Sequence, residues 1–455
     1  MVSASTLLKF ILGVKDIVID RWECTNTKTG TAVLHIWLHP MAKAKNRCPV
    51  CGRKCPVYDG SETMRSWRAL DLNGTLVYLH APSVRVCCPE HGVHVADVPW
   101  AFPGSRFTRS FDLSATRMAE ELSKTATAEF MRIDWETVGR CISRAREYLE
   151  PDPRRRLDGL RAIGVDETSY RKGHKYITVV VNHDTNEVIW AHERHGKEVF
   201  EMFLKELTEE QRASIEIVTG DGARWIDECI KQYLPRCKRC VDGFHVVEWA
   251  NEALDKVRRK SWRDAVEESR RVTKLAHEIH ASCDDETVIQ KADKVAKFAS
   301  DEAKNIKGSL YTLGKAPEHL TEKQKARLAE IALSDKKLYR AYILKEKLRL
   351  IIHMKDVEEA RHALKQFFWR ATHSRIKEFS ELAYKIRRHE ENILNTLAMR
   401  MSNARIEATN NKIKLIIRRS YGFRNIQNMI DMVLLICSNL RAPLPNRPET
   451  ASQVR

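Results

Sequence analysis

Residues 161–245 carry the pattern that most constrains the fold of this 455-residue chain. Short apolar runs typical of strands alternate with helical patterns in the order β-β-β-α-β-α-β. Two of the expected strands end on an acid, the first at Asp166 and a later one at Asp221. In three-layer α/β sheets, ligands bind outside the carboxyl ends of the strands, and neighbouring strands lie about 5 Å apart. The pattern therefore predicts an α/β core in which two carboxylates can share metal ions.

A third acid that could complete such a site lies in residues 402–424. This segment reads SNARIEATNNKIKLIIRRSYGFR and carries six basic residues but one carboxylate, Glu407. Read as a helix, it has an apolar stripe beside a polar face that includes Glu407 and Asn410. We interpret Glu407 as the last ligand of the metal site and the basic side chains as contacts to phosphates. Those basic side chains are Lys412, Lys414, Arg418 and Arg419.

Each of these acids also has an ordinary structural interpretation. A lone aspartate at the end of a strand is usually a turn or helix-cap residue. One acid among cations is usually part of a solvent-exposed i,i+4 pair. The two aspartates together, with Glu407 available downstream, favour the metal site over these alternatives.

The composition restricts the possible partners and the compartment. The net charge of +17 favours a polyanionic partner, most simply nucleic acid, although charge alone also fits a merely soluble basic protein. The twelve cysteines are dispersed through a long chain, which is typical of reduced thiols in a cytoplasm. No segment approaches the length needed to span a membrane. We therefore expect a cytoplasmic protein without a membrane partner.

Two short cysteine motifs near the N-terminus predict a zinc ribbon. Cys48-Pro-Val-Cys51-Gly is followed, after a hairpin-sized insert, by Cys88-Pro-Glu-His91-Gly. Each motif places two ligands in one tight turn, and four such ligands close a tetrahedral structural zinc site. The alternative is a small β domain with buried cysteines. A further cysteine, Cys87, precedes the second motif, so the choice of Cys88 rests on the C-x-x-H spacing.

Residues 107–150 change to a helical pattern. A short helix over 124–132 and a second over 135–146 are joined by a tight turn, and the second is basic. Such a pair is typical of a helix-turn-helix whose second helix can enter the major groove, although short helical pairs are common. The arginines expected to point outward, away from the apolar side of the second helix, are Arg140, Arg144 and Arg146.

Residues 251–398 are almost entirely helical and highly charged in pattern. A helical region of this length between two site-forming segments is best interpreted as an insertion into the α/β core. Its basic faces could cover DNA, although charged helix faces are usually only solvated. Residues 442–455 are expected to form a disordered tail.

Several long motifs, in order and over nearly the whole chain, resemble the ISL3 family of bacterial insertion-sequence transposases. The matching pieces include CPVCG, CPEHG followed by VPWA, and KTATAEFMRIDWETVGR. They continue with GVDETS, VTGDGA, VDGFHVV, YILKEKLR and SNARIEATNNKIKLIIRRSYGFRN. A set of motifs in this order is far more specific than any single acid.

The resemblance implies a DDE transposase with a ribonuclease-H-like catalytic core. It assigns Asp166 and Asp221 as the catalytic aspartates and Glu407 as the glutamate, with Asp242 and His245 as an accessory D-x-x-H signature. It implies two Mg²⁺ or Mn²⁺ ions for each active site, besides one structural Zn²⁺.

The implied substrates are double-stranded DNA, both the inverted repeats of the element and its target. The implied reactions are metal-dependent cleavage followed by strand transfer from a 3′-OH. We expect a homodimer or a higher oligomer on DNA, associated with the bacterial nucleoid. The alternatives are a regulator that uses the zinc ribbon and helix-turn-helix without catalysis, and a structure-specific nuclease on the same core.

The expected fold class is multidomain α/β plus α. The expected domains are a zinc ribbon (1–106), a helix-turn-helix (107–150), a first part of the core (158–250), a helical insertion (251–398), C-terminal core helices (399–441) and the tail (442–455).

Overall fold

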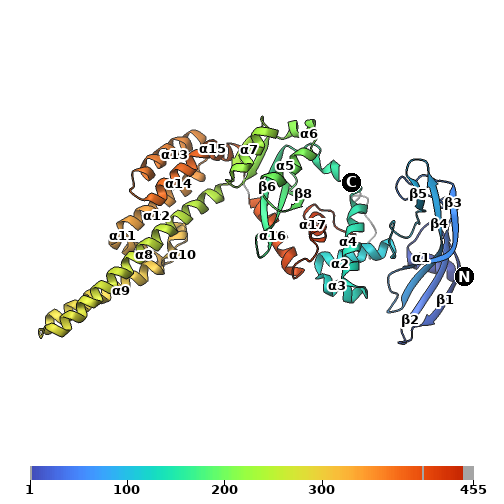
Figure 1. The fold of residues 1–455 in the computed structure, drawn as a ribbon, viewed down its shortest axis with the longest axis horizontal. Coiled ribbons are helices and arrows are strands. Elements are labelled where there is room, and N and C mark those ends of the chain that lie inside the picture. The colour runs from blue at the N-terminus through green and yellow to red at the C-terminus, as the bar shows by residue number, and fades with distance from the viewer. Residues whose placement is uncertain (1–2, 402–403, 444–455) are drawn as a thin grey trace. The chain divides into compact units, whose positions relative to one another are not determined.

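The computed structural model describes residues 3–401 and 404–443, so most of the expected tail lies outside the described residues. The chain divides into two compact units, and each is described by itself. Unit 1 contains described residues within 1–156, 170–172 and 411–443, and unit 2 contains those within 157–169 and 173–410. Figure 1 labels most of the elements of both units.

Unit 1 begins with a five-stranded sheet in the order β1-β2-β4-β3, to which β5 is added beside β4. The first elements are α1 (Ala4–Leu12), β1 (Ile17–Asn26), β2 (Ala32–Pro40), β3 (Val57–Arg68), β4 (Leu76–Cys88) and β5 (Gly92–Val95). Alternate residues of β2 and β4 are buried, among them Ile36, Val77 and Leu79. Trp67 packs edge-to-face on Trp100, with ring centres 5.4 Å apart, and this contact completes the core of the sheet.

Three helices follow the sheet: α2 (Arg109–Glu121), α3 (Lys124–Met131) and α4 (Trp135–Leu149). The expected helix pair is present, because Arg132 ends α3 in a left-handed conformation and Asp134 caps α4 by accepting a hydrogen bond from the Thr137 amide at 2.8 Å. Val138 and Ile142 are fully buried on the apolar side of α4.

The last helix, α17 (Ile426–Cys437), packs against α4. Its buried Asp431 accepts a hydrogen bond from the Ser143 hydroxyl at 2.7 Å and pairs with Arg146 at 3.3 Å. Gly139 permits this approach, because a Cβ there would lie 2.2 Å from Asn428 Nδ2. The sequence placed residues 399–441 in the catalytic core, whereas the structure assigns residues from 411 onward to unit 1.

Unit 2 is built on a second five-stranded sheet in the order β10-β9-β6-β7-β8. Its strands and flanking helices are β6 (Ala162–Arg171), β7 (Lys175–Asn182), β8 (Glu187–Glu193), α5 (Lys197–Glu206), α6 (Glu209–Ser214), β9 (Ile217–Gly220), α7 (Arg224–Tyr233) and β10 (Lys238–Val241). The short 3-10 helix η1 (Pro153–Leu157) contains the point in the chain where unit 1 ends and unit 2 begins. Strands β6, β9 and β10 pair in parallel, while β7 and β8 form an antiparallel hairpin. Phe200 and Phe203 of α5 pack on Val218 and Ile163.

The rest of unit 2 is helical. The elements are α8 (Gly243–Ser282), α9 (Glu286–Lys307), α10 (Leu310–Gly314), η2 (Pro317–His319), α11 (Glu322–Ser334), α12 (Lys336–Ile352), α13 (Val357–Thr372), α14 (Lys377–Arg388), α15 (Glu390–Met399) and the start of α16 (Ala404–Arg419). Helices α8 and α9 form a long antiparallel hairpin (Figure 1). The first part of α8 packs with α12 and α14 around Leu254, Leu348 and Phe379.

Within the described part of the chain, every helix is too short or too polar to cross a membrane.

Candidate active site and zinc centre

Three aspartates of the parallel strands of unit 2 share one register. Asp221 and Asp242 directly follow β9 and β10, whereas Asp166 lies within β6, which was expected to end there but continues to Arg171. Gly164 of β6 lies opposite Thr219 of β9, and Gly220 lies opposite Val241 of β10. The same register places Asp166 level with Asp221, and Asp221 level with Asp242. A hydrogen bond of 3.4 Å from the Asp242 amide to the Gly220 carbonyl continues it beyond the strands. Since neighbouring strands lie about 4.8 Å apart, the aspartates gather at one edge of the sheet.

The first turns of α16 meet this edge. The amide of Asn410 donates a hydrogen bond to Asp166 Oδ2, and the Thr168 hydroxyl donates to Asn410 Oδ1 at 2.8 Å. Ile406 packs so closely on Gly164 that a Cβ there would lie 2.1 Å from its Cδ1. Glu407 stands three residues before Asn410, on the same side of the helix.

Glu407 is exposed and, with Asp242, lines a cavity of about 740 Å³. The structure therefore places Glu407 on the helix whose Asn410 binds Asp166, although the two acids are far apart in the sequence.

The electrostatic environment of Asp166 reflects this crowding. Burial raises the pKa of the Asp166 carboxyl, and the negative charge of Asp221 raises it further. Hydrogen bonds from the Glu167 amide and from Asn410, and the charge of His245, act in the opposite direction. A divalent cation at this position would offset the repulsion between the two carboxylates and keep Asp166 ionised.

Two charged groups near the aspartates were not predicted from the sequence. Arg239 is buried within β10, donates to the backbone carbonyl of Asp221 and pairs with Asp227 at 3.2 Å. Glu167 accepts a hydrogen bond from the Gly196 amide at 2.8 Å, and burial raises the pKa of its carboxyl. The signal for Arg239 was available, because a cation inside a short apolar strand requires buried partners.

Carboxylate oxygens are the ligands that Mg²⁺ and Mn²⁺ prefer, so the donor set fits these ions. Among the described residues, the ligand atoms of the cysteine cluster all lie within 4.8 Å of one another. The three acids do not form such a close group. Two catalytic ions lie about 4 Å apart, so their ligands spread over a wider area than those of one ion.

The cysteine cluster is the predicted zinc centre. Ligand atoms of Cys48, Cys51, Cys88 and His91 all lie within 4.8 Å of one another, with 3.8 Å between the Cys51 and Cys88 sulfurs. A tetrahedral ion with Zn–S bonds of about 2.3 Å requires sulfur separations of this size. Cys87 lies outside the group, because neighbouring residues of a strand such as β4 point to opposite faces.

The arginines of α4 occupy different environments. The Arg140 side chain is 65% exposed and pairs weakly with Glu136 one turn earlier, at 3.4 Å. Arg144 donates two hydrogen bonds, of 2.7 and 3.0 Å, to Asp112 of α2, whose side chain is fully buried. Arg144 was expected to point outward to DNA, but the structure gives it a buried partner on α2.

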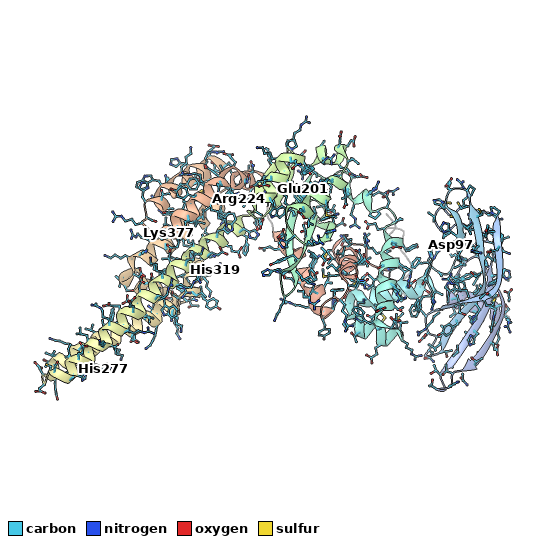
Figure 2. All side chains as sticks on the ribbon, in the orientation of Figure 1. Asp97, Glu201, Arg224, His277, His319 and Lys377 are labelled. Carbon is cyan, nitrogen blue, oxygen red and sulfur yellow. The ribbon has the colours of Figure 1, made fainter. Side chains whose placement is uncertain are left out.

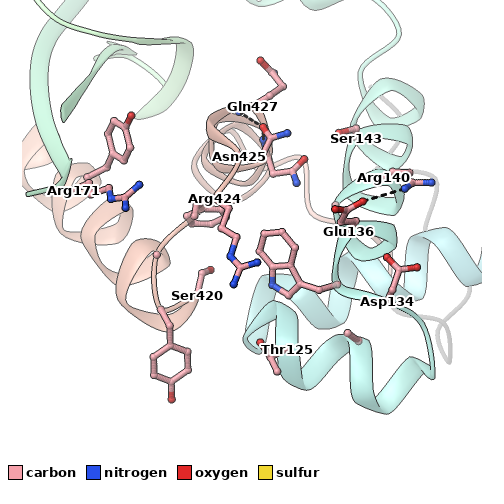
Figure 3. Close-up of a pocket in the computed structure, with 18 of the residues that line it drawn as sticks. Thr125, Asp134, Glu136, Arg140, Ser143, Arg171, Ser420, Arg424, Asn425 and Gln427 are labelled. Atoms are coloured by element: carbon pink, nitrogen blue, oxygen red, sulfur yellow. Dashed lines mark hydrogen bonds and ion pairs between the residues drawn. The ribbon is translucent and has the colours of Figure 1, made fainter.

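A cavity of about 1580 Å³ in unit 1 lies beside Arg140 (Figure 3). It is lined by the first turns of α4, by the segment from Ser420 to Asn428 and by Tyr170 and Arg171. The side chains of Arg140, Arg171 and Arg424 all line it. A fourth arginine, Arg144, and two acids, Asp134 and Glu136, complete its charged lining. The size of the cavity and the excess of arginines suit a polyanionic ligand.

The predicted phosphate contacts on α16 also differ from one another. Lys412, Lys414 and Arg418 are exposed. Arg419 is half-buried and binds the C-terminal end of α2, through the Glu121 carboxylate at 3.4 Å and the Glu121 carbonyl at 3.3 Å.

Comparison with known families agrees with this organisation. A zinc-finger model of transposase IS204/IS1001/IS1096/IS1165 matches residues 44–91, and the helix-turn-helix domain of transposase family ISL3 matches residues 96–146. The ISL3 DDE transposase model, described as a transposase, matches residues 163–433, more than half of the chain.

Similar proteins include the transposase for insertion sequence element IS1557 from two strains of Mycobacterium tuberculosis, CDC 1551 / Oshkosh and ATCC 25618 / H37Rv. Each is 39% identical over 446 residues, which is 97% of both chains. The transposase for IS1001 from Bordetella parapertussis is 25% identical over 397 residues, which is 86% of this chain and 88% of the relative. These matches confirm the resemblance found in the motifs. The chain therefore belongs to the ISL3 family of DDE transposases and is a DNA-transposing enzyme with zinc-ribbon and helix-turn-helix domains.

Proposed function

We propose that this transposase binds the terminal inverted repeats of its insertion sequence, cleaves the DNA there and joins the resulting 3′-OH to target DNA. The catalytic residues of the proposal are Asp166, Asp221 and Glu407. The observation that carries it is the register of β6 and β9, which sets Asp166 level with Asp221 while Asn410, three residues from Glu407, binds Asp166.

Each residue has a distinct part in the proposed chemistry. Two Mg²⁺ or Mn²⁺ ions, when bound, activate the attacking oxygen and stabilise the leaving one. Asp166, Asp221 and Glu407 would hold these ions. Asn410 fixes the orientation of Asp166, and Arg239 holds the backbone of Asp221. Asp242 and His245 are accessory, with His245 close enough to act on the charge of Asp166.

The strand arrangement supports a ribonuclease-H-like core. Numbered within the core, the sheet order is 5-4-1-2-3, with the first strand, β6, in the centre. The first acid lies on this central strand and the second follows the neighbouring parallel strand, β9. The helices from α8 to α15 then form the insertion that separates these acids from Glu407.

End recognition is proposed for the N-terminal part of the chain, with α4 in the major groove and Arg140 as a base-contacting side chain. Lys412, Lys414 and Arg418, all exposed, are proposed contacts to phosphates. A transposon has two ends, so we infer a homodimer or a higher oligomer on DNA.

The two arginines of α4 should respond differently to replacement by alanine. Arg140→Ala should lower the preference for the element's own end over random duplex, because a base contact contributes about 1–3 kcal/mol of discrimination. Arg144→Ala should instead lower the free energy of unfolding by about 3–5 kcal/mol, since it leaves Asp112 buried and unpaired. Binding titrations on both duplexes, together with thermal unfolding, measure the two effects. An unchanged end preference for Arg140→Ala would place recognition elsewhere, with the zinc ribbon as the next candidate.

The proposed function is tested with linear duplexes that carry the cloned ends of the element. The wild-type chain should cut at the end of the repeat when Mg²⁺ or Mn²⁺ is supplied, and should join the pre-cut end to a plasmid. Binding without cutting would support the regulator alternative. Cutting without joining would support the nuclease alternative.

A further inference from the structure

A groove rich in cations lies between α8 and α14 of unit 2, with a volume of about 600 Å³. Lys256, Arg259, Lys260 and Arg263 line it from α8, and Lys377 lines it from α14, where Figure 2 labels it. Two carboxylates, Glu378 and Glu381, and the ring of Trp262 complete the lining. We name this feature the α8 groove.

Most of the α8 cations have no acidic partner. Arg259 pairs with Asp255 at 2.9 Å. In the parts of the chain that the structure describes, Lys256, Lys260 and Arg263 form no ion pair. Arg263 donates from Nε to the Arg259 carbonyl at 3.3 Å, which leaves the other guanidinium donors available. The groove therefore has an excess of positive charge that its own side chains do not neutralise.

The spacing of these cations matches a phosphate backbone. Lys256, Lys260 and Arg263 stand at i, i+4 and i+7, so they share one face of α8. At 1.5 Å per residue they extend over about 10 Å of the helix. Phosphates along one strand of duplex DNA advance by about 3.4 Å per nucleotide. The three side chains can thus meet phosphates within about four consecutive nucleotides of one strand.

A further cation connects the groove with the active site. Lys385 of α14 has its Nζ 3.7 Å from the ring centre of Trp249. Burial is the main reason that the pKa of Lys385 is lowered. The negative charges of Glu252 and Asp221 act in the opposite direction, and the positive charge of Lys256 lowers it further. Arg388, one turn later, is exposed and adds to the positive field around Lys385. Positive side chains therefore extend from the neighbourhood of Asp221 into the α8 groove.

We propose that the α8 groove binds the phosphate backbone of the DNA that flanks the element next to the cleavage site. Its lining is dominated by flexible lysine and arginine side chains, which suit phosphate contacts that do not depend on sequence. Flanking DNA has this property, because its sequence changes with every insertion. The inference rests on the proposed function, since it takes Asp221 as part of the cleavage site.

Two triple variants of the full chain test the groove. The first is Lys256→Gln/Lys260→Gln/Arg263→Gln. The matched control is Lys291→Gln/Lys294→Gln/Lys297→Gln on α9, which removes three exposed cations from the far part of the helical hairpin. Midpoint temperatures of thermal unfolding that equal the wild-type value establish that both variants are folded. The salt dependence of binding to a random duplex should become shallower by two to three units for the groove variant, at about 0.9 units per lost phosphate contact, and should not change for the control.

A second experiment locates the bound DNA. It measures the cleavage rate of duplexes that carry the element's end next to progressively shorter flanks. The wild type and the control should cleave faster as the flank lengthens, whereas the groove variant should lose this dependence and should match the wild type on the shortest flank. Equal effects of both variants, or none, would overturn the proposal. A defect confined to joining pre-cut ends would assign the groove to target DNA and overturn the flank assignment. If the wild type binds DNA through the groove but cuts nothing, the proposed function fails instead.

Discussion

Asp221→Asn should abolish metal-dependent DNA cleavage while leaving binding to the element's end nearly intact. The amide keeps the size of the side chain but loses the negative charge that holds a divalent cation. Loss of one electrostatic contact to a transition state already costs about 10²–10³ in rate, so the loss of a metal ligand should cost at least that much. Cleavage of an end-labelled duplex, measured at protein concentrations that saturate binding, separates the rate from the affinity.

The matched control for this variant is Asp184→Asn. Asp184 belongs to the turn between β7 and β8, where it pairs with Arg161 at 2.8 Å on the surface of the same core. The control should cleave at the wild-type rate, because a partly exposed pair contributes little to stability. Undiminished cleavage by Asp221→Asn, with Mg²⁺ or with Mn²⁺, would contradict the proposed site. Loss of end binding in this variant alone would give Asp221 a structural role.

The sequence indicated where the aspartates stand but not how the strands align. Apolar, β-branched runs such as residues 176–181 can be recognised as buried strands from the sequence alone, because the signal is the composition of the run itself. The register that sets Asp166 level with Asp221 depends on pairing between strands distant in the sequence. The cysteine motifs were more informative, since the turn between two ligands is itself local and determines which atoms can share one ion.

Residues whose partners lie on other elements could not be read from local patterns. Arg144 was expected at the DNA because α3 and α4 were considered as a pair, whereas α2 supplies a buried carboxylate, Asp112. The position of α17 escaped prediction for a similar reason. An apolar helix must be buried against another element, but its own sequence does not identify that element. In the structure, the bonds from Ser143 and Arg146 to Asp431 join α17 to α4.

Cys88→Ser should release the zinc and loosen the end of the sheet that carries the two cysteine turns. Zinc contributes directly to the stability of such sites, with an apparent binding free energy of about 10–16 kcal/mol in zinc-finger peptides. The apolar packing around the site is small, limited mainly to Cys48, Cys55, Val86 and Cys88 with Ala96 beside them. The larger core around Trp67 and Trp100 is separate, so the rest of the sheet should persist. Metal analysis of the purified chain and protease cleavage within residues 44–56 measure these two effects.

Cys87→Ser is the control that isolates the ligand from its neighbour. Both residues lie on β4, one position apart, so each substitution makes the same chemical change in almost the same place. Only the Cys88 sulfur approaches the others, at 3.8 Å from Cys51 Sγ and 3.5 Å from His91 Nδ1. One zinc per chain should therefore remain after Cys87→Ser and be lost after Cys88→Ser. The reverse result would exchange the two cysteines in the ligand set, and retention of zinc by both variants would exclude Cys88 as a required ligand.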